Sequence, residues 1–258
     1  MEYLVLFLIG LAVGSFLNVV IFRLKHGDSP MKGRSYCDHC KGKIAWFDNI
    51  PLLSFLFLGG KCRTCRKKIP VDYPLVELLA GLQFVWIYWL LTVNFNFFNS
   101  WEGFYSLALL VYWLLLFSGS LVIAVYDFKH MLIPDEVLWP LIIVSFLRLF
   151  VSQQWQVVPV AFLSMGFILS LWLLTKKKGI GFGDIKLAFL MGLVLGSPRI
   201  IIAFMIAFLT GAVVGVILLL LRVKKFKSQI AFGPFLLLGM IVAKLWGYQV
   251  WQWYFRLL

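Results

Sequence analysis

Two aspartates, Asp127 in A-V-Y-D-F-K-H and Asp184 in G-F-G-D-I-K, lie at the ends of long apolar stretches. Ionised carboxylates are costly beside hydrocarbon and usually functional when they occur there. Asp184 also has an ordinary explanation, because a carboxylate at a helix start caps the helix and complements its dipole. Asp127 is expected near the carboxyl end of its helix, where the dipole disfavours negative charge. The two aspartates are therefore the first candidates for chemistry.

The expected topology brings both aspartates to one side of a membrane, because Asp127 ends one apolar segment and Asp184 begins another. Two carboxylates that share a site hold a single proton, so one can deprotonate a water molecule while the other protonates a carbonyl oxygen. This is the chemistry of aspartic proteases. The alternating glycines before Asp184, with Gly181 and Gly183 nearest, predict a flexible catalytic loop that uses positive φ and approaches a peptide closely. A plain turn between helices is the alternative.

Four cysteines form two C-x-x-C pairs, Cys37 with Cys40 and Cys62 with Cys65. Two such pairs supply four thiolates to a tetrahedral metal, and a short segment with little core gains folding energy from zinc. A redox disulfide pair is the weaker alternative in a reducing compartment. Because four cysteines leave no open coordination position, the predicted zinc is structural.

Composition defines the elements that must position these groups. Hydrophobic residues make up 62% of the 258 residues, more than one soluble core uses, so the sequence predicts an all-α polytopic membrane protein. Runs of about 20 apolar residues match a bilayer core. They lie near 2–24, 73–93, 103–126, 134–152, 156–175, 184–197, 199–222 and 231–256. We expect about eight transmembrane helices, with seven as the alternative because the sixth run is short.

The net charge of +13 is unevenly distributed along the chain. Twenty basic residues fall in the segments 23–72, 129, 175–187 and 222–230, which the topology places on one face. Cytoplasmic loops carry such an excess, so this face is predicted to be cytoplasmic and no nucleic-acid partner is expected. The predicted domains are a first helix at 1–24, a retained anchor with its terminus outside, a cytoplasmic cysteine segment at 25–72 and a membrane domain at 73–258.

An ordered set of motifs spans nearly the whole chain. It comprises G-S-F-L-N-V-V-I-F-R-L (14–24), the paired C-x-x-C, W-F-D-N-I-P-L-L-S (46–54), G-G-K-C (59–62), Y-P-L-V-E-L (73–78), D-F-K-H-M-L-I-P-D (127–135), G-F-G-D-I-K-L (181–187) and F-G-P-F (232–235). With these motifs the chain resembles the type IV prepilin leader peptidases, which are also N-methyltransferases. The G-x-G-D element alone is shared with presenilin-like proteases, whereas the ordered set is specific. The resemblance implies that Asp127 and Asp184 are the catalytic dyad of a bacterial inner-membrane enzyme.

The resemblance also implies the substrate and the second activity. Prepilins or pseudopilins with a short basic leader would be cleaved at the cytoplasmic face, and the new amino terminus would be methylated from S-adenosylmethionine. Acidic residues such as Glu77 and Asp135 are candidates for holding the basic leader. We find no glycine-rich cofactor loop in the sequence, so no contacts to S-adenosylmethionine are assigned. Neither the particular pilin nor the oligomeric state follows from the sequence.

Two other classes of protein compete with the protease. A transporter or channel can relay protons through membrane acids, but such acids usually lie near the midplane of the bilayer and accompany internal repeats. A zinc-bearing membrane scaffold without catalysis is the other alternative. It predicts that neutral substitutions at both aspartates leave the pathway intact.

Overall fold

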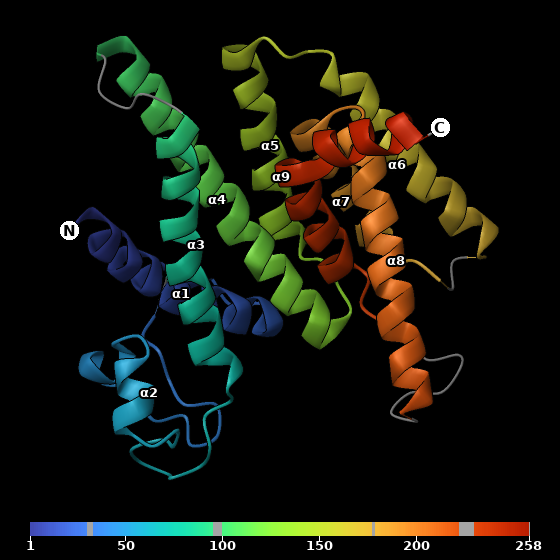
Figure 1. The fold of residues 1–258 in the computed structure, drawn as a ribbon. Coiled ribbons are helices and arrows are strands. Elements are labelled where there is room, and N and C mark those ends of the chain that lie inside the picture. The colour runs from blue at the N-terminus through green and yellow to red at the C-terminus, as the bar shows by residue number, and fades with distance from the viewer. Residues whose placement is uncertain (30–32, 95–99, 177–178, 222–229, 258) are drawn as a thin grey trace. The chain divides into compact units, whose positions relative to one another are not determined.

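The chain forms a helical structure in a computed structural model that describes residues 1–29, 33–94, 100–176, 179–221 and 230–257 (Figure 1). Its elements are α1 (Glu2–His26), the 3₁₀ helix η1 (Trp46–Asn49), α2 (Leu53–Phe57), α3 (Asp72–Asn94), α4 (Ser100–His130), α5 (Asp135–Ser152), α6 (Val157–Leu174), α7 (Phe182–Leu195), α8 (Arg199–Leu220) and α9 (Gly233–Leu257). Among these described residues there is no strand, only two isolated β-bridges. The predicted all-α class is confirmed.

Each of the eight predicted apolar runs is a helix, but they do not all qualify as spans. Six described helices are long and apolar enough to cross a membrane, namely α1, α3, α4, α6, α8 and α9. The 14 residues of α7 extend about 21 Å, which is less than the bilayer core of roughly 30 Å. The 18 residues of α5 include three charged side chains, Asp135, Glu136 and Arg148. The structure therefore supports six spans and does not confirm the expected eight.

Some of the expected loop charges lie outside the described residues. These are Lys32, Lys177, Lys178 and the four basic residues between 222 and 230, together with residues 95–99 of a polar connection.

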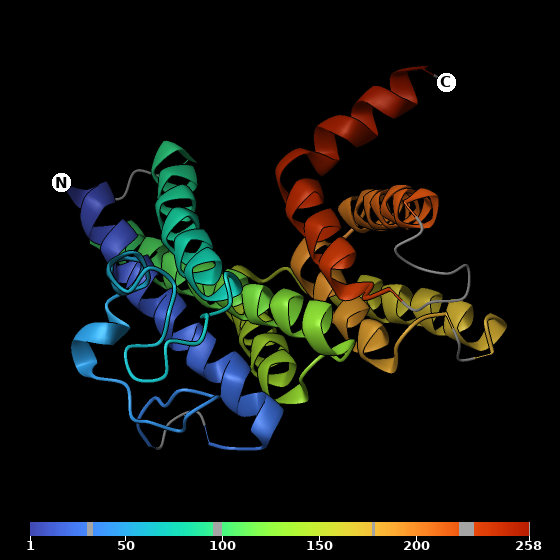
Figure 2. The ribbon, with the colours of Figure 1, turned by 90° about the horizontal axis from the view of Figure 1, so that it is seen from below.

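The chain divides into an N-terminal unit, Met1–Val122, and a C-terminal unit, Ile123–Leu258, with the boundary inside α4. In the N-terminal unit α1 packs against α3 (Figure 2). Small residues allow this close approach, because a Cβ atom at Gly14 would lie 2.6 Å from Cα of Glu77. Asn18 Nδ2 donates a hydrogen bond to the carbonyl oxygen of Tyr73 at 2.9 Å, which links α1 to the start of α3.

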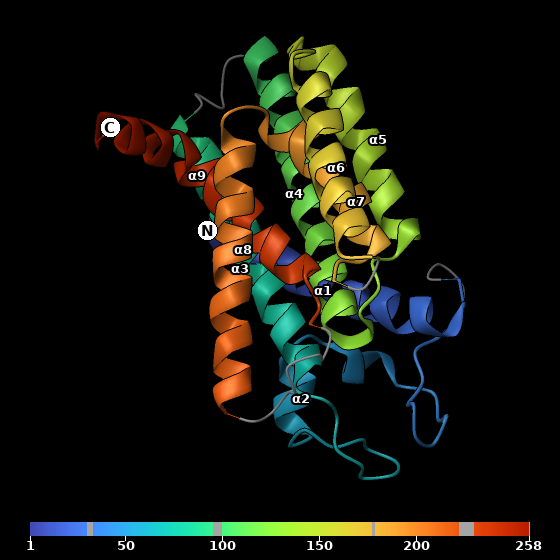
Figure 3. The ribbon, with the colours of Figure 1, turned by 90° about the vertical axis from the view of Figure 1, so that its right-hand side faces the viewer.

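In the C-terminal unit α7 is the central helix, and it packs against α5, α6, α8 and α9 (Figure 3). From Ile185 to Leu195 nearly every side chain of α7 is buried. A helix that is apolar on all sides belongs inside a bundle, which explains how a segment too short to span a bilayer still folds there. Ser164 of α6 donates a hydrogen bond to the carbonyl oxygen of Ala188 at 2.8 Å and fixes α6 beside α7. The first turn of α7 is thereby held in place.

Candidate active site

Asp127 lies one turn before the end of α4, and its side chain is buried at 4% exposure. Its Oδ2 accepts a hydrogen bond from the backbone N–H of Gly233 at 2.9 Å. Because Gly233 is the first residue of α9, the carboxylate complements the positive end of that helix. Asp127 thus caps a helix remote in sequence. The local sequence around Asp127 predicts only its place at the end of its own helix and gives no sign of this role.

Asp184 lies in the first turn of α7, and its side chain is 5% exposed. Its Oδ2 accepts the backbone N–H of Gly181, the residue before the helix, at 2.9 Å. Asp184 therefore acts as the third-position member of a capping box, not as the residue directly before the helix. The capping explanation and a catalytic role are compatible, because this bond occupies only one carboxylate oxygen.

The two carboxylates lie close enough for the charge on Asp127 to act on Asp184. Each directs Oδ2 to a peptide N–H at a helix start, Asp127 at α9 and Asp184 at α7. Among the described residues no hydrogen bond reaches Oδ1 of either side chain. The pair thus combines two buried acids that repel each other with two helix dipoles that partly offset the repulsion. Such a pair can hold one proton and orient a water molecule.

Gly233 is the residue of this site that the sequence analysis overlooked. A Cβ atom built there would lie 2.6 Å from Oδ2 of Asp127, so a larger residue would displace the carboxylate from its place at the start of α9. The F-G-P-F motif was the available signal. It contributed to the resemblance but received no role of its own.

The glycines before Asp184 behave differently from expectation. Gly181 has φ −75° and ψ 151°, an extended backbone open to any residue, and Gly183 lies within α7. Neither belongs to the described glycines with positive φ, so the expected left-handed backbone is wrong. Close approach explains Gly183 instead, since a Cβ atom there would lie 2.8 Å from Cβ of Ile133. The loop is shaped by contact, not by an unusual φ.

The acidic residues proposed for the basic leader are both engaged within the protein. Asp135, the first residue of α5, accepts hydrogen bonds from Nζ of Lys186 at 2.8 and 2.7 Å. Half of the Asp135 side chain remains exposed. Glu77 is half-buried in α3 and accepts the backbone N–H of Leu52 at 2.8 Å.

The four cysteines gather at one point of the N-terminal unit. All are free thiols, and their sulfur atoms lie within 4.8 Å of one another. The sulfurs of Cys37 and Cys65 are 3.9 Å apart. Tetrahedral zinc with Zn–S bonds of about 2.3 Å requires sulfurs about 3.8 Å apart. The cluster therefore fits a four-thiolate metal site.

The same turn builds both cysteine pairs. In the first, the N–H of Cys37 bonds to the carbonyl oxygen of Gly42 at 2.9 Å, and in the second Cys62 bonds to Lys67 at 2.9 Å. Both turns also place a residue with positive φ four positions after the first cysteine, at Lys41 and Arg66. Two copies of one knuckle thus face each other and point their thiols inward.

The backbone of the second knuckle favours a thiolate. The N–H groups of Cys65 and Thr64 lower the pKa of Cys62 from 9.0 to about 7, with further hydrogen bonds from Cys37 and Cys65 acting in the same direction. Only the deprotonated sulfur is a metal ligand.

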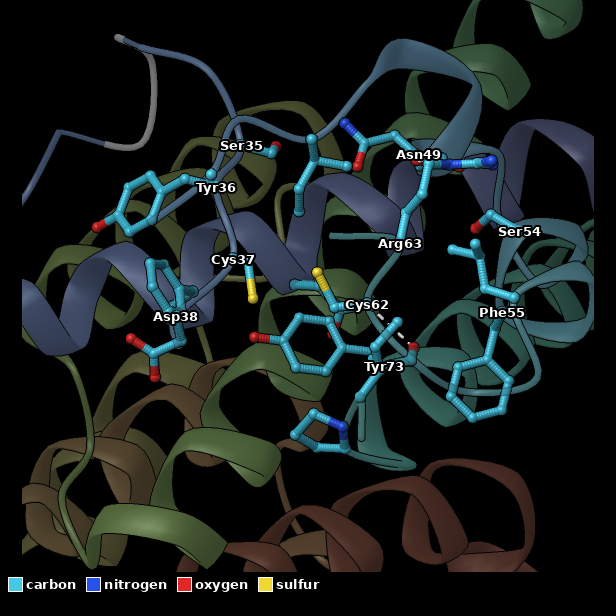
Figure 4. A pocket seen from close by; sticks show the side chains of 18 of the residues that line it. Ser35, Tyr36, Cys37, Asp38, Asn49, Ser54, Phe55, Cys62, Arg63 and Tyr73 are labelled. Carbon is cyan, nitrogen blue, oxygen red and sulfur yellow. Dashed lines mark hydrogen bonds and ion pairs between the residues drawn. The ribbon is translucent and has the colours of Figure 1, made fainter. Parts of the chain in front are cut away.

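A cavity of about 310 Å³ lies beside this cluster, between α1, the start of α3 and the knuckles. Figure 4 shows the ring of Tyr73 and the sulfurs of Cys37 and Cys62 pointing into the same space. Apolar surface dominates its lining, with polar groups from Asn18 and Glu77 among them. Its volume is at the lower end of the range of small-molecule sites.

Comparisons with known proteins identify the family of the chain. Residues 8–91 match the bacterial peptidase A24 N-terminal domain, and residues 114–216 match the type IV leader peptidase family. The chain is 35% identical to a prepilin leader peptidase/N-methyltransferase of Aeromonas hydrophila, over 96% of this chain and 92% of that protein. Proteins of the same name from Stutzerimonas stutzeri and Pseudomonas aeruginosa are each 34% identical. They cover 94% and 96% of this chain and 90% and 92% of their own lengths.

No solved structure matches the chain. The family models and these near full-length relatives together show that the chain belongs to the type IV leader peptidase family.

Proposed function

We propose that the chain is a membrane aspartic endopeptidase that cleaves the basic leader from type IV prepilins or pseudopilins, with Asp127 and Asp184 as its catalytic residues. The observation that supports this most strongly is the buried, mutually repelling pair of carboxylates held at two helix starts. Both aspartates lie within the part of the chain that matches the leader peptidase family. Buried, paired acids of this kind serve proton transfer more often than structure.

The mechanism follows from one proton shared by two carboxylates. The ionised aspartate takes a proton from a water molecule, and the oxygen of that water forms a bond to the scissile carbonyl carbon. The protonated aspartate gives its proton to the carbonyl oxygen. When the carbon–nitrogen bond breaks, the aspartate that took the water proton passes it to the leaving amine. The other aspartate takes a proton from a hydroxyl of the tetrahedral intermediate as the carbonyl re-forms, so the pair again holds one proton. The N–H groups of Gly181 and Gly233 hold Oδ2 of each acid, which leaves Oδ1 for the water and the substrate.

The four cysteines would hold one structural zinc ion. Their number, free state and mutual distances fit tetrahedral coordination, and zinc bound there would supply folding energy to a segment of short elements. The protein would therefore need zinc for the shape of its N-terminal unit and not for peptide hydrolysis.

The name of the relatives supports a second activity, N-methylation of the new amino terminus. S-adenosylmethionine would supply the methyl group, and the cavity beside the cysteine cluster is the candidate site. It has the volume of a small-molecule site, apolar walls for an adenine ring and polar atoms at Asn18 and Glu77 to orient a ligand. Glu77 is better suited to this cavity than to holding the leader, because it lines the cavity and binds Leu52.

The enzyme would work as a multi-pass protein of the bacterial inner membrane with its dyad at the cytoplasmic face. The six apolar helices and the family support the membrane. Arg23, Lys25 and His26 in the last turn of α1 support a cytoplasmic end there. A dyad at this face meets the bond between the soluble leader and the membrane-bound part of the substrate.

Cleavage of a purified prepilin tests the dyad. Asp127→Asn and Asp184→Asn each remove one ionisable group while keeping the shape of the side chain. We expect cleavage to fall by at least about 10³-fold in both variants, because neither remaining acid can replace the shared proton. Product formation is measured by mass spectrometry in detergent or vesicles.

Folding must be checked in the same preparations. Unchanged zinc content and methylation of a pre-cleaved substrate would show that the N-terminal unit is intact in both variants. Cleavage at near the wild-type rate in either variant would reject the dyad and favour the scaffold alternative.

A further inference from the structure

A patch of large apolar side chains is exposed on the segment between the two cysteine pairs. The patch comprises Trp46, Phe47, Ile50, Leu53, Leu56 and Phe57, from η1, α2 and their connection, and we call it the 46–57 patch. Trp46, Leu56 and Phe57 are 75%, 72% and 87% exposed. Large exposed apolar groups gathered on one short segment are typical of a site of contact with a membrane or another protein.

The opposite side of the same segment holds it to the cysteine knuckles. Asp48 accepts two hydrogen bonds from the Arg63 guanidinium at 2.9 and 2.7 Å. The ring of Phe55 packs over Gly60, where a Cβ atom would lie 3.1 Å from it. The segment is therefore anchored through these inward groups, and the 46–57 patch is left facing outward.

Two contacts tie this segment to the sides of membrane helices. Leu52 donates its N–H to Glu77 of α3 at 2.8 Å, and Ser15 of α1 donates its hydroxyl to the carbonyl oxygen of Asn49 at 3.5 Å. Residues 15–26 account for about 16 Å of α1, and residues 72–77 for about 8 Å of α3. Both contacts thus lie on the sides of helices that are long and apolar enough to cross a membrane, and not at the ends of those helices.

Charge on the neighbouring loops suits an anionic lipid surface. The knuckle turns on both sides of the segment carry Lys43, Lys61, Arg66, Lys67 and Lys68, while Lys41 is paired with Asp38 and Arg63 with Asp48. Basic residues beside an apolar, aromatic segment are the pattern of peptides that lie in the headgroup layer. Tryptophan is also enriched at that depth.

From these observations we propose that the 46–57 patch is inserted into the lipid leaflet next to the cysteine cluster. The occupant is the bilayer, because the segment that carries the patch is bonded to the sides of α1 and α3, and α3 also exposes Leu75, Leu79 and Leu82. The cysteine segment is then a membrane-embedded unit, not a freely solvated loop. If the cavity serves methyl transfer as proposed above, this insertion holds it at the depth where a membrane-bound substrate presents its new amino terminus.

Photo-crosslinking of the full-length protein tests the insertion. Phe57 is replaced by p-benzoylphenylalanine, and the protein is placed in vesicles of phosphatidylethanolamine and phosphatidylglycerol. The same label at Leu82 of α3 is the lipid-exposed reference, and the label at Lys41, whose side chain is 62% exposed, is the reference for solvent. We expect a yield of lipid adduct at residue 57 close to that at residue 82 and at least about tenfold above that at residue 41.

Other results would overturn the proposal. A yield at residue 57 as low as that at residue 41 would place the patch in water. A crosslink between two chains in place of lipid adducts would make the patch a contact between copies. If the label at residue 57 lowers the zinc content, the same label at Trp46 reads the same patch independently. Neither reading depends on catalytic activity, so failure of the proposed methyl transfer would leave this test unaffected.

Discussion

The two units of the chain hold polar groups by different means. In the C-terminal unit, helix starts and a close-packed bundle fix two buried aspartates, and each carboxylate receives one peptide N–H. In the N-terminal unit, short turns with positive φ at Lys41 and Arg66 bring four partly exposed cysteines together. The first site draws its rigidity from packing, whereas the second needs a ligand to complete it. Loss of the metal should therefore affect structure, whereas a substitution at the aspartates should affect mainly activity.

Metal removal should produce the larger structural effect, because it acts on the unit without a packed core around its site. Cys62→Ser or a strong chelator should abolish zinc binding and make residues 33–70 sensitive to protease, since structural zinc contributes about 10–16 kcal/mol to small domains of this kind. Zinc content and limited proteolysis measure the outcome. The C-terminal unit should resist proteolysis throughout. Digestion of both units at the same time would contradict the proposed difference between them.

Gly233→Ala should disturb the aspartate pair while changing the stability of the fold little. The added Cβ must displace Oδ2 of Asp127, and an error of about 1 Å at a reacting group can cost 10²-fold in rate. We expect kcat for cleavage to fall by about 10- to 100-fold with KM nearly unchanged, as measured in a steady-state assay.

Gly166→Ala is the matched control, because a Cβ atom at Gly166 of α6 meets nothing within 4 Å. It should keep full activity and gain slightly in stability. Equal activity of the two variants would contradict the assigned contact between Gly233 and Asp127.

Zinc binding should weaken as the pH falls below about 7. The pKa of Cys62 in the metal-free protein is lowered from 9.0 to about 7, so its thiolate is favoured above that pH and is lost to protonation below it. Zinc must displace the proton of every thiol that is still protonated, including Cys65, whose pKa is raised to about 11. Protonation of Cys62 below pH 7 adds one more proton, so the fall in apparent zinc affinity steepens there by about tenfold per pH unit. Titration with a fluorescent zinc chelator between pH 6 and pH 8 measures the slope. An affinity that stays constant across this range would contradict the assignment.

The smallest expected effect concerns the ion pair between Asp135 and Lys186. Such half-exposed pairs contribute about 0.2–1 kcal/mol, so Asp135→Asn should raise KM for a basic leader by no more than about fivefold. Lys186→Gln breaks the same pair but frees the carboxylate. If Asp135 holds the leader, Lys186→Gln should lower KM. If the pair is purely structural, KM should change in the same direction in both variants.

The sequence could predict much of the fold because a bilayer imposes a simple rule on the chain. Every apolar run near the length of a bilayer core became a helix, and boundaries agreed within a few residues. The expected number of spans is not confirmed at α5 and α7. Apolar length alone does not separate a helix that faces lipid from one that other helices surround, as they surround α7.

At the candidate site, too, the sequence predicts one part and the tertiary structure decides the other. Residue type and spacing determined which groups carry chemistry, since four cysteines in two close pairs and two acids beside apolar runs stand out without any coordinates. Only the tertiary structure decided what those groups touch. Gly233 donates to Asp127 across more than a hundred residues, and Lys186 engages Asp135 across about fifty. Such contacts depend on which distant helix ends lie side by side, and the local sequence does not predict this.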